Sequence, residues 1–238
     1  MNRSKKSRER ILETAERLFA LNGFHRTTIT QLTSEAKVNI AAVNYHFGSK
    51  RVLIEQIIER RLPLISQRCL EELRKIRKTT IQECCQPDIE DVLRAFIEPA
   101  LTGNGTIQNS AYFLLIASRG FYNPDDTIRN IFARHVKDNF QLCLELMRDV
   151  LPDLPERILL WRIHFAIGSL SHAMHLCGFQ LPTPDISPPM ESMEFVVNQL
   201  LSFVTCGMKA PCQGKNEMMP DYGDPILGRL NTMGENNE

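Results

Sequence analysis

Residues 28–50 constrain the fold most, because this short stretch contains two helical segments that are each preceded by a capping residue. Thr28 stands before the segment 29–36, with a glutamine three positions later, and this spacing predicts a capping box at the start of a helix. Asn39, a favoured N-cap residue, stands before a second segment, 40–46. Two short helices joined by a tight turn predict a helix-turn-helix motif.

A longer amphipathic segment, residues 4–22, precedes this motif. Ile11, Ala15 and Leu18 recur at three- and four-residue spacing while charged residues fill the other face, which predicts one helix. Gly23 follows, and because glycine adopts the left-handed conformation at little cost, we expect the helix to end there.

A second long periodic segment, residues 50–76, follows Ser49, which is a good N-cap residue. Its apolar positions include Leu53 and Ile57, and we predict one long helix that links the two parts of the chain. Pro63 lies inside this segment, so we expect a kink where its missing backbone N–H removes a hydrogen bond.

The rest of the chain keeps helical periodicity, and no segment alternates as a half-buried strand does. We therefore predict an all-α protein with a three-helix N-terminal domain and a larger C-terminal helical domain. The further helices are predicted over 89–101, 107–118, 124–151, 155–179 and 188–206. The predicted divisions are residues 1–50, residues 51–207, and a loosely ordered tail, 208–238, that is rich in Gly, Asn, Pro and Met.

The net charge of zero conceals a strong division along the chain. Residues 1–78 contain 17 Lys and Arg against 8 Asp and Glu, and residues 79–238 contain 11 against 20. A basic N-terminal part joined to an acidic remainder favours a module that binds a polyanion, attached to a separate regulatory body. A solvated charged helix face is the plainer explanation of the same asymmetry.

The sequence offers no membrane or metal signal. No run of about 18 apolar residues could span a bilayer, and residues 1–6 continue into charged residues, so we expect a cytoplasmic protein with no membrane partner. None of the seven cysteines is paired in a Cys-x-x-Cys motif, which argues against a disulfide framework or a zinc ribbon. We expect no cofactor and no metal.

The second short helix carries the side chains best suited to a DNA duplex. Small residues let a helix sit deep in the major groove, and an asparagine amide pairs bidentately with adenine, whereas tyrosine and histidine donate to phosphate oxygens. A lysine in the first turn of the next helix adds a cation beside free backbone N–H groups. The predicted DNA contacts are Thr28, Ala41, Asn44, Tyr45, His46 and Lys50.

These residues resemble the TetR family of bacterial regulators over about the first 55 positions. One departure is that Asn44 stands where the family frequently has tyrosine, so an operator preference cannot be carried over. The segment 38–50 looks more like the fatty-acid-responsive PsrA-type branch, as do, more weakly, 161–165 and 207–209. The residues that carry the family resemblance are Ile11-Leu12 through Phe19, Gly23-Phe24, Thr28, and Asn44-Tyr45-His46-Phe47 with Ser49-Lys50.

The resemblance implies a homodimer on a palindromic operator, in which the last two long helices of each chain form a four-helix bundle. It also implies a small-molecule effector bound in a cavity of each C-terminal domain, whose occupancy changes the spacing of the two recognition helices. We expect a repressor that its ligand releases from DNA, and the branch suggests a long-chain fatty acid or an acyl thioester.

Candidates in the C-terminal domain are less specific. Aromatic residues at helical spacing are more often ordinary core than pocket lining. His172 and His175 lie one turn apart near Cys177, a spacing compatible with a metal, although helix-surface polar residues are the plainer explanation. The predicted pocket residues are Phe113, Phe121, Phe140, Trp161 and His164, and Arg119, Arg134 and Arg162 are unranked candidates to bind an effector carboxylate.

Two other classes of function compete with a regulator. An enzyme is not expected, because the sequence contains no Gly-x-Ser-x-Gly, no His-Glu-x-x-His and no phosphate loop. A helical interaction module, or a nonspecific nucleic-acid binder without effector control, is the alternative, and specific binding to DNA upstream of the chain's own gene would separate these from a regulator.

Overall fold

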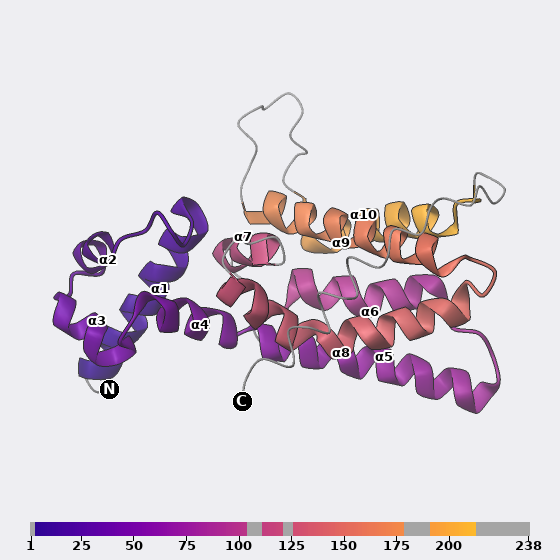
Figure 1. Ribbon diagram of the computed structural model, residues 1–238, viewed down its shortest axis with the longest axis horizontal. Coiled ribbons are helices and arrows are strands. Elements are labelled where there is room, and N and C mark those ends of the chain that lie inside the picture. The colour runs from indigo at the N-terminus through magenta and orange to yellow at the C-terminus, as the bar shows by residue number, and fades with distance from the viewer. Residues whose placement is uncertain (1–2, 104–110, 121–125, 179–190, 213–238) are drawn as a thin grey trace, which may run out of the picture.

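The computed structural model describes residues 3–103, 111–120, 126–178 and 191–212, and every regular element in these ranges is an α-helix (Figure 1). The helices are α1 (Arg3–Asn22), α2 (Ile29–Ala36), α3 (Ile40–Phe47), α4 (Lys50–Glu59), α5 (Leu62–Glu83), α6 (Ile89–Thr102), α7 (Ala111–Gly120), α8 (Asp126–Val150), α9 (Glu156–Gly178) and α10 (Met193–Lys209). The predicted all-α fold is confirmed.

The three N-terminal helices begin and end within one residue of their predicted bounds. The predicted end of α1 is confirmed at Gly23, which has a φ of 84° and donates its amide to the carbonyl of Phe19 at 3.0 Å. Helices α2 and α3 pack against each other and against α1, so the expected helix-turn-helix is present.

The predicted single helix over 50–76 is wrong, because the chain forms two helices there. Helix α4 ends at Glu59 and α5 begins at Leu62, with Pro63 in its first turn. In a continuous helix the proline ring would collide with the carbonyl of Glu59, four residues earlier, whereas the first turn needs no N–H at that position. The proline therefore starts a helix instead of kinking one.

The later helices follow the predicted pattern with shifted ends. Helices α6, α8 and α9 lie within two residues of their predicted bounds. Helix α7 extends to Gly120, and residues 107–110 of its predicted range lie outside the described residues. Helix α10 begins at Met193 instead of 188, because the Ser192 hydroxyl caps it by accepting from the Phe195 amide at 3.2 Å. Of the predicted tail, 213–238 lies outside the described residues.

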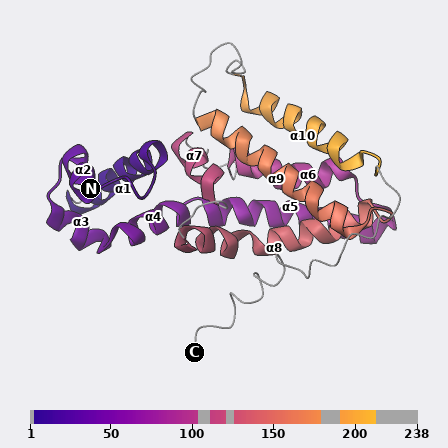
Figure 2. The same cartoon turned by 45° about the horizontal axis from the view of Figure 1, so that its top comes forward.

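The helices form a small body at one end, α1 to α4, and an elongated body that contains α5, α6, α8, α9 and α10 (Figure 1). In the long body α5 packs against α6 and α8, while α10 packs against α6 and α9. Helix α7 lies between the two bodies, in contact with α1 on one side and α9 on the other (Figure 2).

Two clusters of buried side chains make the core. The first joins α1 to α4 with the start of α5 and with Phe113 and Phe132 of α7 and α8. The second fills the space among α5, α6, α8, α9 and α10. Because the first cluster continues across α7 and α8, the small N-terminal body is packed onto the long body and not merely tethered to it.

Of the helices that the structure describes, none combines the length and the apolar character that a bilayer span requires.

Candidate functional site

Helix α3 turns one polar face to solvent. Ala41, Asn44 and Tyr45 are exposed, with 83% of the tyrosine accessible, while Val43 and Phe47 are buried in the core. The division follows from 3.6 residues per turn, which puts positions 41, 44 and 45 opposite 43 and 47. The buried pair fixes the rotation of the helix, so the exposed asparagine amide is free to pair with groups outside the protein.

The helix ends around this face are fixed by side-chain caps. The predicted Thr28 cap is confirmed by its hydroxyl, which accepts from the Gln31 backbone amide at 3.1 Å. The predicted Asn39 cap is confirmed by its side-chain Oδ1, which accepts from the Ala42 backbone amide at 2.8 Å. The reciprocal half of the predicted box is not formed, because the Gln31 side chain donates to Glu35 at 3.3 Å instead. Thr28 itself is exposed at the start of α2.

Lys50, whose phosphate contact stays a prediction, is also bonded within the protein. Its ammonium donates to the carbonyl oxygens of Phe24 at 2.8 Å and Thr27 at 3.0 Å, and it lies 4.5 Å from the centre of the Phe24 ring. A cation that is bonded to backbone carbonyls and lies over an aromatic face is held by the protein. Lys50 therefore ties the loop between α1 and α2 to the start of α4.

His46 is only half-buried, at the last turn of α3. Its ring lies edge-on to Tyr45, with 5.1 Å between ring centres, and 6.1 Å from Phe47. The predicted contact of His46 with a phosphate stays a prediction, as do those of the other residues of this face.

Sequence reasoning missed Ile40, which is 51% exposed at the first position of α3. Ile40 is not among the predicted DNA contacts, although it lies one turn before Asn44. Its spacing of three and seven residues from the buried Val43 and Phe47 is typical of the apolar face, so the sequence pattern gave no signal of this exposure. An exposed aliphatic side chain there suits the methyl group of thymine.

The N-terminal body also carries basic side chains at its surface. The exposed ones are Lys5, Lys6, Arg10, Arg26, Lys37, Arg51 and Arg60. Positive charge on a protein surface attracts a phosphate backbone, and this attraction does not depend on base sequence.

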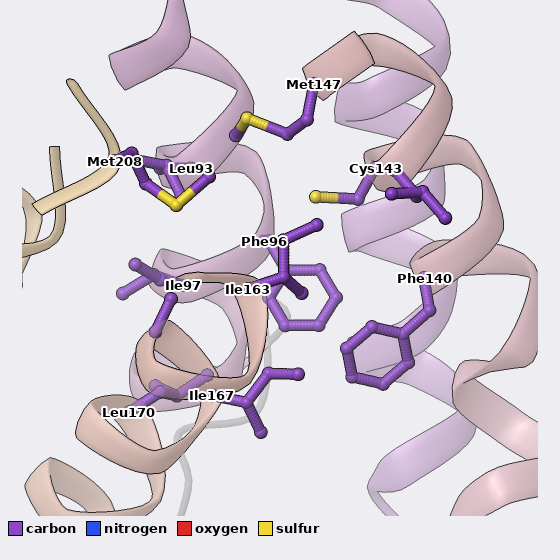
Figure 3. Close-up of a pocket in the computed structure, with 12 residues that line it drawn as sticks. Leu93, Phe96, Ile97, Phe140, Cys143, Met147, Ile163, Ile167, Leu170 and Met208 are labelled. Carbon is purple, nitrogen blue, oxygen red and sulfur yellow. The ribbon is translucent and has the colours of Figure 1, made fainter. Parts of the chain in front are cut away.

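A cavity lies inside the long body, among α6, α8, α9 and α10 (Figure 3). The rings of Phe96 and Phe140 lie at its centre, 4.9 Å apart. The thiol of Cys143 in its wall stays neutral, because burial, and secondly the neighbouring Cys69, raise its pKa to about 12. The lining is wholly apolar or sulfur-bearing: Leu93, Phe96, Ile97, Phe140, Cys143, Leu144, Met147, Ile163, Ala166, Ile167, Leu170 and Met208.

The cavity is small. Its volume of about 30 Å³ is close to that of one water molecule, whereas ligand pockets usually enclose roughly 300–1,000 Å³. An organic ligand can therefore enter only if the helices around the cavity move apart.

Two family models match the chain. Residues 11–57 match the model described as bacterial regulatory proteins, tetR family, and residues 94–207 match the tetracyclin repressor-like C-terminal domain. The chain belongs to the TetR family. It is thus a DNA-binding transcriptional regulator, and members of this family are transcription factors and not enzymes. No curated protein sequence is similar enough to count as a match.

Solved structures share the fold of this TetR-family regulator at low sequence identity. A HlyIIR mutant protein is 16% identical with a TM-score of 0.54, and the match covers 85% of this chain and 97% of that one. The fatty acid degradation regulator FadR from Bacillus halodurans is 13% identical with a TM-score of 0.51, covering 86% and 97%. A transcriptional regulator from Saccharomonospora viridis, in complex with choline, is 24% identical with a TM-score of 0.50, covering 84% and 96%.

Of the predicted pocket residues that the structure describes, only Phe140 lines the cavity. Phe113 lies in α7 and is buried in the first core cluster, away from the cavity. Trp161 is 55% exposed and His164 is also exposed, its ring nitrogen 2.9 Å from the Leu160 carbonyl oxygen. Phe121 lies outside the described residues. Trp161 and His164 of α9 face away from the cavity. Helical spacing groups them on one face, but it does not say whether that face packs against other helices of the chain.

The three candidate arginines are bonded within the protein. The Arg119 guanidinium donates to the Ala20 carbonyl at 3.1 Å, and that of Arg162 to the Met208 carbonyl at 2.6 Å. Arg134 pairs with Glu59 at 2.6 Å. None of the three lines the cavity.

The predicted cluster near the end of α9 does not converge. His172 is exposed, and the Cys177 sulfur lies 4.0 Å from the sulfur of Met193. Within the described ranges, no three His, Cys, Asp or Glu side chains gather as metal ligands. Burial lowers the pKa of His175, and the positive charges of Arg119 and then His172 lower it further.

Proposed function

We propose that this TetR-family regulator is a cytoplasmic repressor that binds a palindromic operator as a homodimer and leaves it when an apolar effector enters the C-terminal cavity. The exposed face of α3 carries the proposal, because Ala41, Asn44 and Tyr45 lie together on a helix held by capped neighbours. In this assignment Asn44 reads a base edge, while Tyr45, His46 and Thr28 contact phosphates.

The dimer is proposed to form through α9 and α10, as the family resemblance implies. Exposed aromatic side chains support this choice, with 65% of Phe165 and 70% of Phe203 accessible in the single chain. Trp161 and Phe195 are exposed on the same two helices. Large apolar side chains left in water favour burial against a partner surface.

The effector is proposed to be a long-chain fatty acid or an acyl thioester. The support is the chemistry of the lining, which offers hydrocarbon, aromatic and sulfur atoms and no charge to the interior. Binding would expand the cavity and displace α9, and through the dimer the spacing of the two α3 helices. Half-sites one DNA turn apart require a fixed spacing, so such a displacement weakens binding.

The first test is fluorescence anisotropy with DNA from upstream of the chain's own gene, against random DNA of equal length. We expect much tighter binding to the upstream fragment, and about a tenfold or greater loss when palmitate is added. Equal binding to both DNAs would support the nonspecific binder, and binding that palmitate leaves unchanged would remove the effector assignment. Native mass spectrometry of the purified protein would show whether a lipid is bound already.

The second test concerns Asn44. The Asn44→Ala variant should lose about 1–3 kcal/mol of binding free energy on its preferred operator, with the loss confined to one base pair of each half-site. Gln141→Ala, which removes an exposed amide from α8, is the matched control and should bind as the wild type does. A uniform loss on every DNA sequence would contradict the role of Asn44 in reading a base.

A further inference from the structure

We propose that α7 transmits the state of the cavity to the DNA-binding helices, and that Arg119 is the positioning residue at its contact with α1. This inference rests on the proposed effector control and names the elements through which it acts.

Helix α7 is fixed to α9 at both of its ends. At its start, α9 approaches so closely that a Cβ on Gly178 would lie 2.5 Å from the Ala111 carbonyl oxygen. Near its other end, the Ser171 hydroxyl of α9 donates to the Ser118 carbonyl. Two such attachments leave α7 little freedom to slide along α9, so a shift of α9 carries α7 with it.

Helix α9 is also a wall of the cavity. Ile163, Ala166, Ile167 and Leu170 line the cavity, and Leu170 directly precedes the Ser171 that holds α7. The space of about 30 Å³ cannot hold an organic ligand unless a wall moves. The residues of α9 that a ligand would displace therefore lie next to Ser171, the residue that is bonded to α7.

On its other side α7 holds the end of α1. The Arg119 guanidinium donates to the carbonyl oxygen of Ala20, at 3.1 Å. Ala20 lies in the last turn of α1, where carbonyl groups lack partners in the helix and carry partial negative charge, so the cation is well placed to bind there. Helix α1 in turn packs against α2 and α3, so its position sets that of the DNA-binding face.

A second contact keeps α7 and α1 in register. Arg61, at the break between α4 and α5, pairs with the buried Glu16 of α1 at 2.7 Å, and its guanidinium lies 5.5 Å from the centre of the Phe113 ring in α7. This contact holds the middle of α1 in place, while Arg119 holds its end. A shift of α7 is therefore expected to tilt α1 about the Glu16 contact.

The other route between the two bodies runs from α8 to α4. His135 and Arg134 of α8 both lie against Glu59, at 2.8 and 2.6 Å. Helix α8 lines the cavity directly, with Phe140, Cys143, Leu144 and Met147, and the first of these lies between one and two turns beyond His135. This route supplies the comparison that a test of α7 needs.

The experiment is a double-mutant cycle on the full-length protein, read as the Kd for the operator. Ala166→Leu fills the cavity from α9 and serves as the probe, so that no effector is required. We expect it to raise the Kd about tenfold in the wild-type background and less than about threefold in an Arg119→Met background. Arg119→Lys, which can still donate to the Ala20 carbonyl, should restore most of the effect.

Two further cycles complete the test. Arg157→Met, at an exposed arginine of α9, and Glu59→Gln, in the α8 to α4 route, should each leave the effect of Ala166→Leu near tenfold. Urea unfolding and sedimentation velocity verify that each variant folds and assembles as the wild type does. The proposal is overturned if Ala166→Leu raises the operator Kd by the same factor in the wild-type and Arg119→Met backgrounds. It is also overturned if Glu59→Gln, and not Arg119→Met, abolishes this effect, or if Ala166→Leu leaves the Kd unchanged. Failure of the unmodified protein to bind the operator would instead reject the proposed function.

Discussion

Lys50 shows how a residue in a DNA-binding motif stabilises the fold of that motif. Its ammonium joins carbonyl groups of the loop that leads into α2 to the first turn of α4, and that loop positions Thr28. A hydrogen bond from a charged group to the backbone contributes more than one between neutral groups. The lysine therefore stabilises the arrangement of α2 and α4.

Lys50→Met is predicted to lower the free energy of unfolding by about 1–3 kcal/mol, because it removes charged hydrogen bonds to partly buried carbonyl groups. Chemical denaturation measures this change. Arg51→Met, at the exposed neighbour, is the control and should leave stability within about 0.5 kcal/mol of the wild type. Weaker operator binding with unchanged stability would instead support a direct phosphate contact.

His175 makes stability depend on pH. Burial lowers its pKa, and Arg119 and His172 add to the shift, so the unfolded chain binds a proton more readily than the folded protein does. Stability from this group is therefore complete above the ordinary histidine value of 6.5 and is lost as the pH falls below it. The loss levels off once the pH passes the lowered pKa of the folded state.

His175→Gln is predicted to flatten the pH dependence of unfolding between about pH 7.5 and 5.5, because the glutamine does not titrate. Urea titrations across this range measure the slope. His164→Gln, on the exposed side of α9, is the matched variant. An unchanged slope in His175→Gln would mean that other groups carry the acid sensitivity.

At the scale of elements, close approach of helices matters more than helix propensity. Gly168 and Gly178 both lie in α9, yet a Cβ at Gly168 would meet nothing within 4 Å, while one at Gly178 would collide with the Ala111 carbonyl and the Leu115 side chain. Glycine is unfavourable inside a helix relative to alanine. The same substitution is thus expected to act in opposite directions at the two positions.

Gly178→Ala is predicted to destabilise the protein by about 1–3 kcal/mol, because α7 must move away from α9 to make room. Gly168→Ala should stabilise it by about 0.5–1 kcal/mol through helix propensity alone. Both changes are measured by chemical denaturation. Stabilisation by both substitutions would show that α7 and α9 do not pack as tightly as the structure indicates.

At the scale of the whole molecule, α9 and α10 carry most of the exposed aromatic side chains among the described residues. Trp161 and Phe165 lie side by side, with ring centres 5.8 Å apart, and Phe203 is 70% exposed on the neighbouring helix. Burial of one such side chain contributes about 1.5–3 kcal/mol. A dimer formed through these two helices would recover that free energy.

Phe203→Glu is predicted to shift the protein from dimer to monomer and to lower operator affinity by about tenfold or more, because a carboxylate is costly to bury and single half-sites bind weakly. Sedimentation velocity measures the first effect and anisotropy the second. Ile81→Glu, at an equally exposed side chain near the end of α5, is the control and should remain dimeric. A dimer that survives Phe203→Glu but not Ile81→Glu would place the interface elsewhere.

Local chemistry explains how much could be predicted in advance. The caps at Thr28, Asn39 and Ser49 act over three residues, and periodicity determines which face of a helix is apolar, so the helix-turn-helix could be located from sequence alone. The carbonyl partners of Lys50 could not be predicted from sequence, because they lie 23 and 26 residues away and meet it only after α1 and α4 have packed.

The amino-acid sequence by itself determined the all-α character, the order of the helices and the polar face of α3, since each depends on neighbours within one or two turns. Tertiary structure alone decided which apolar residues enclose the cavity, where α7 joins the two bodies, and that Trp161 faces outward. The physical reason is that helical periodicity specifies an apolar face but not its partner, and the partner is set by how helices distant in sequence pack together.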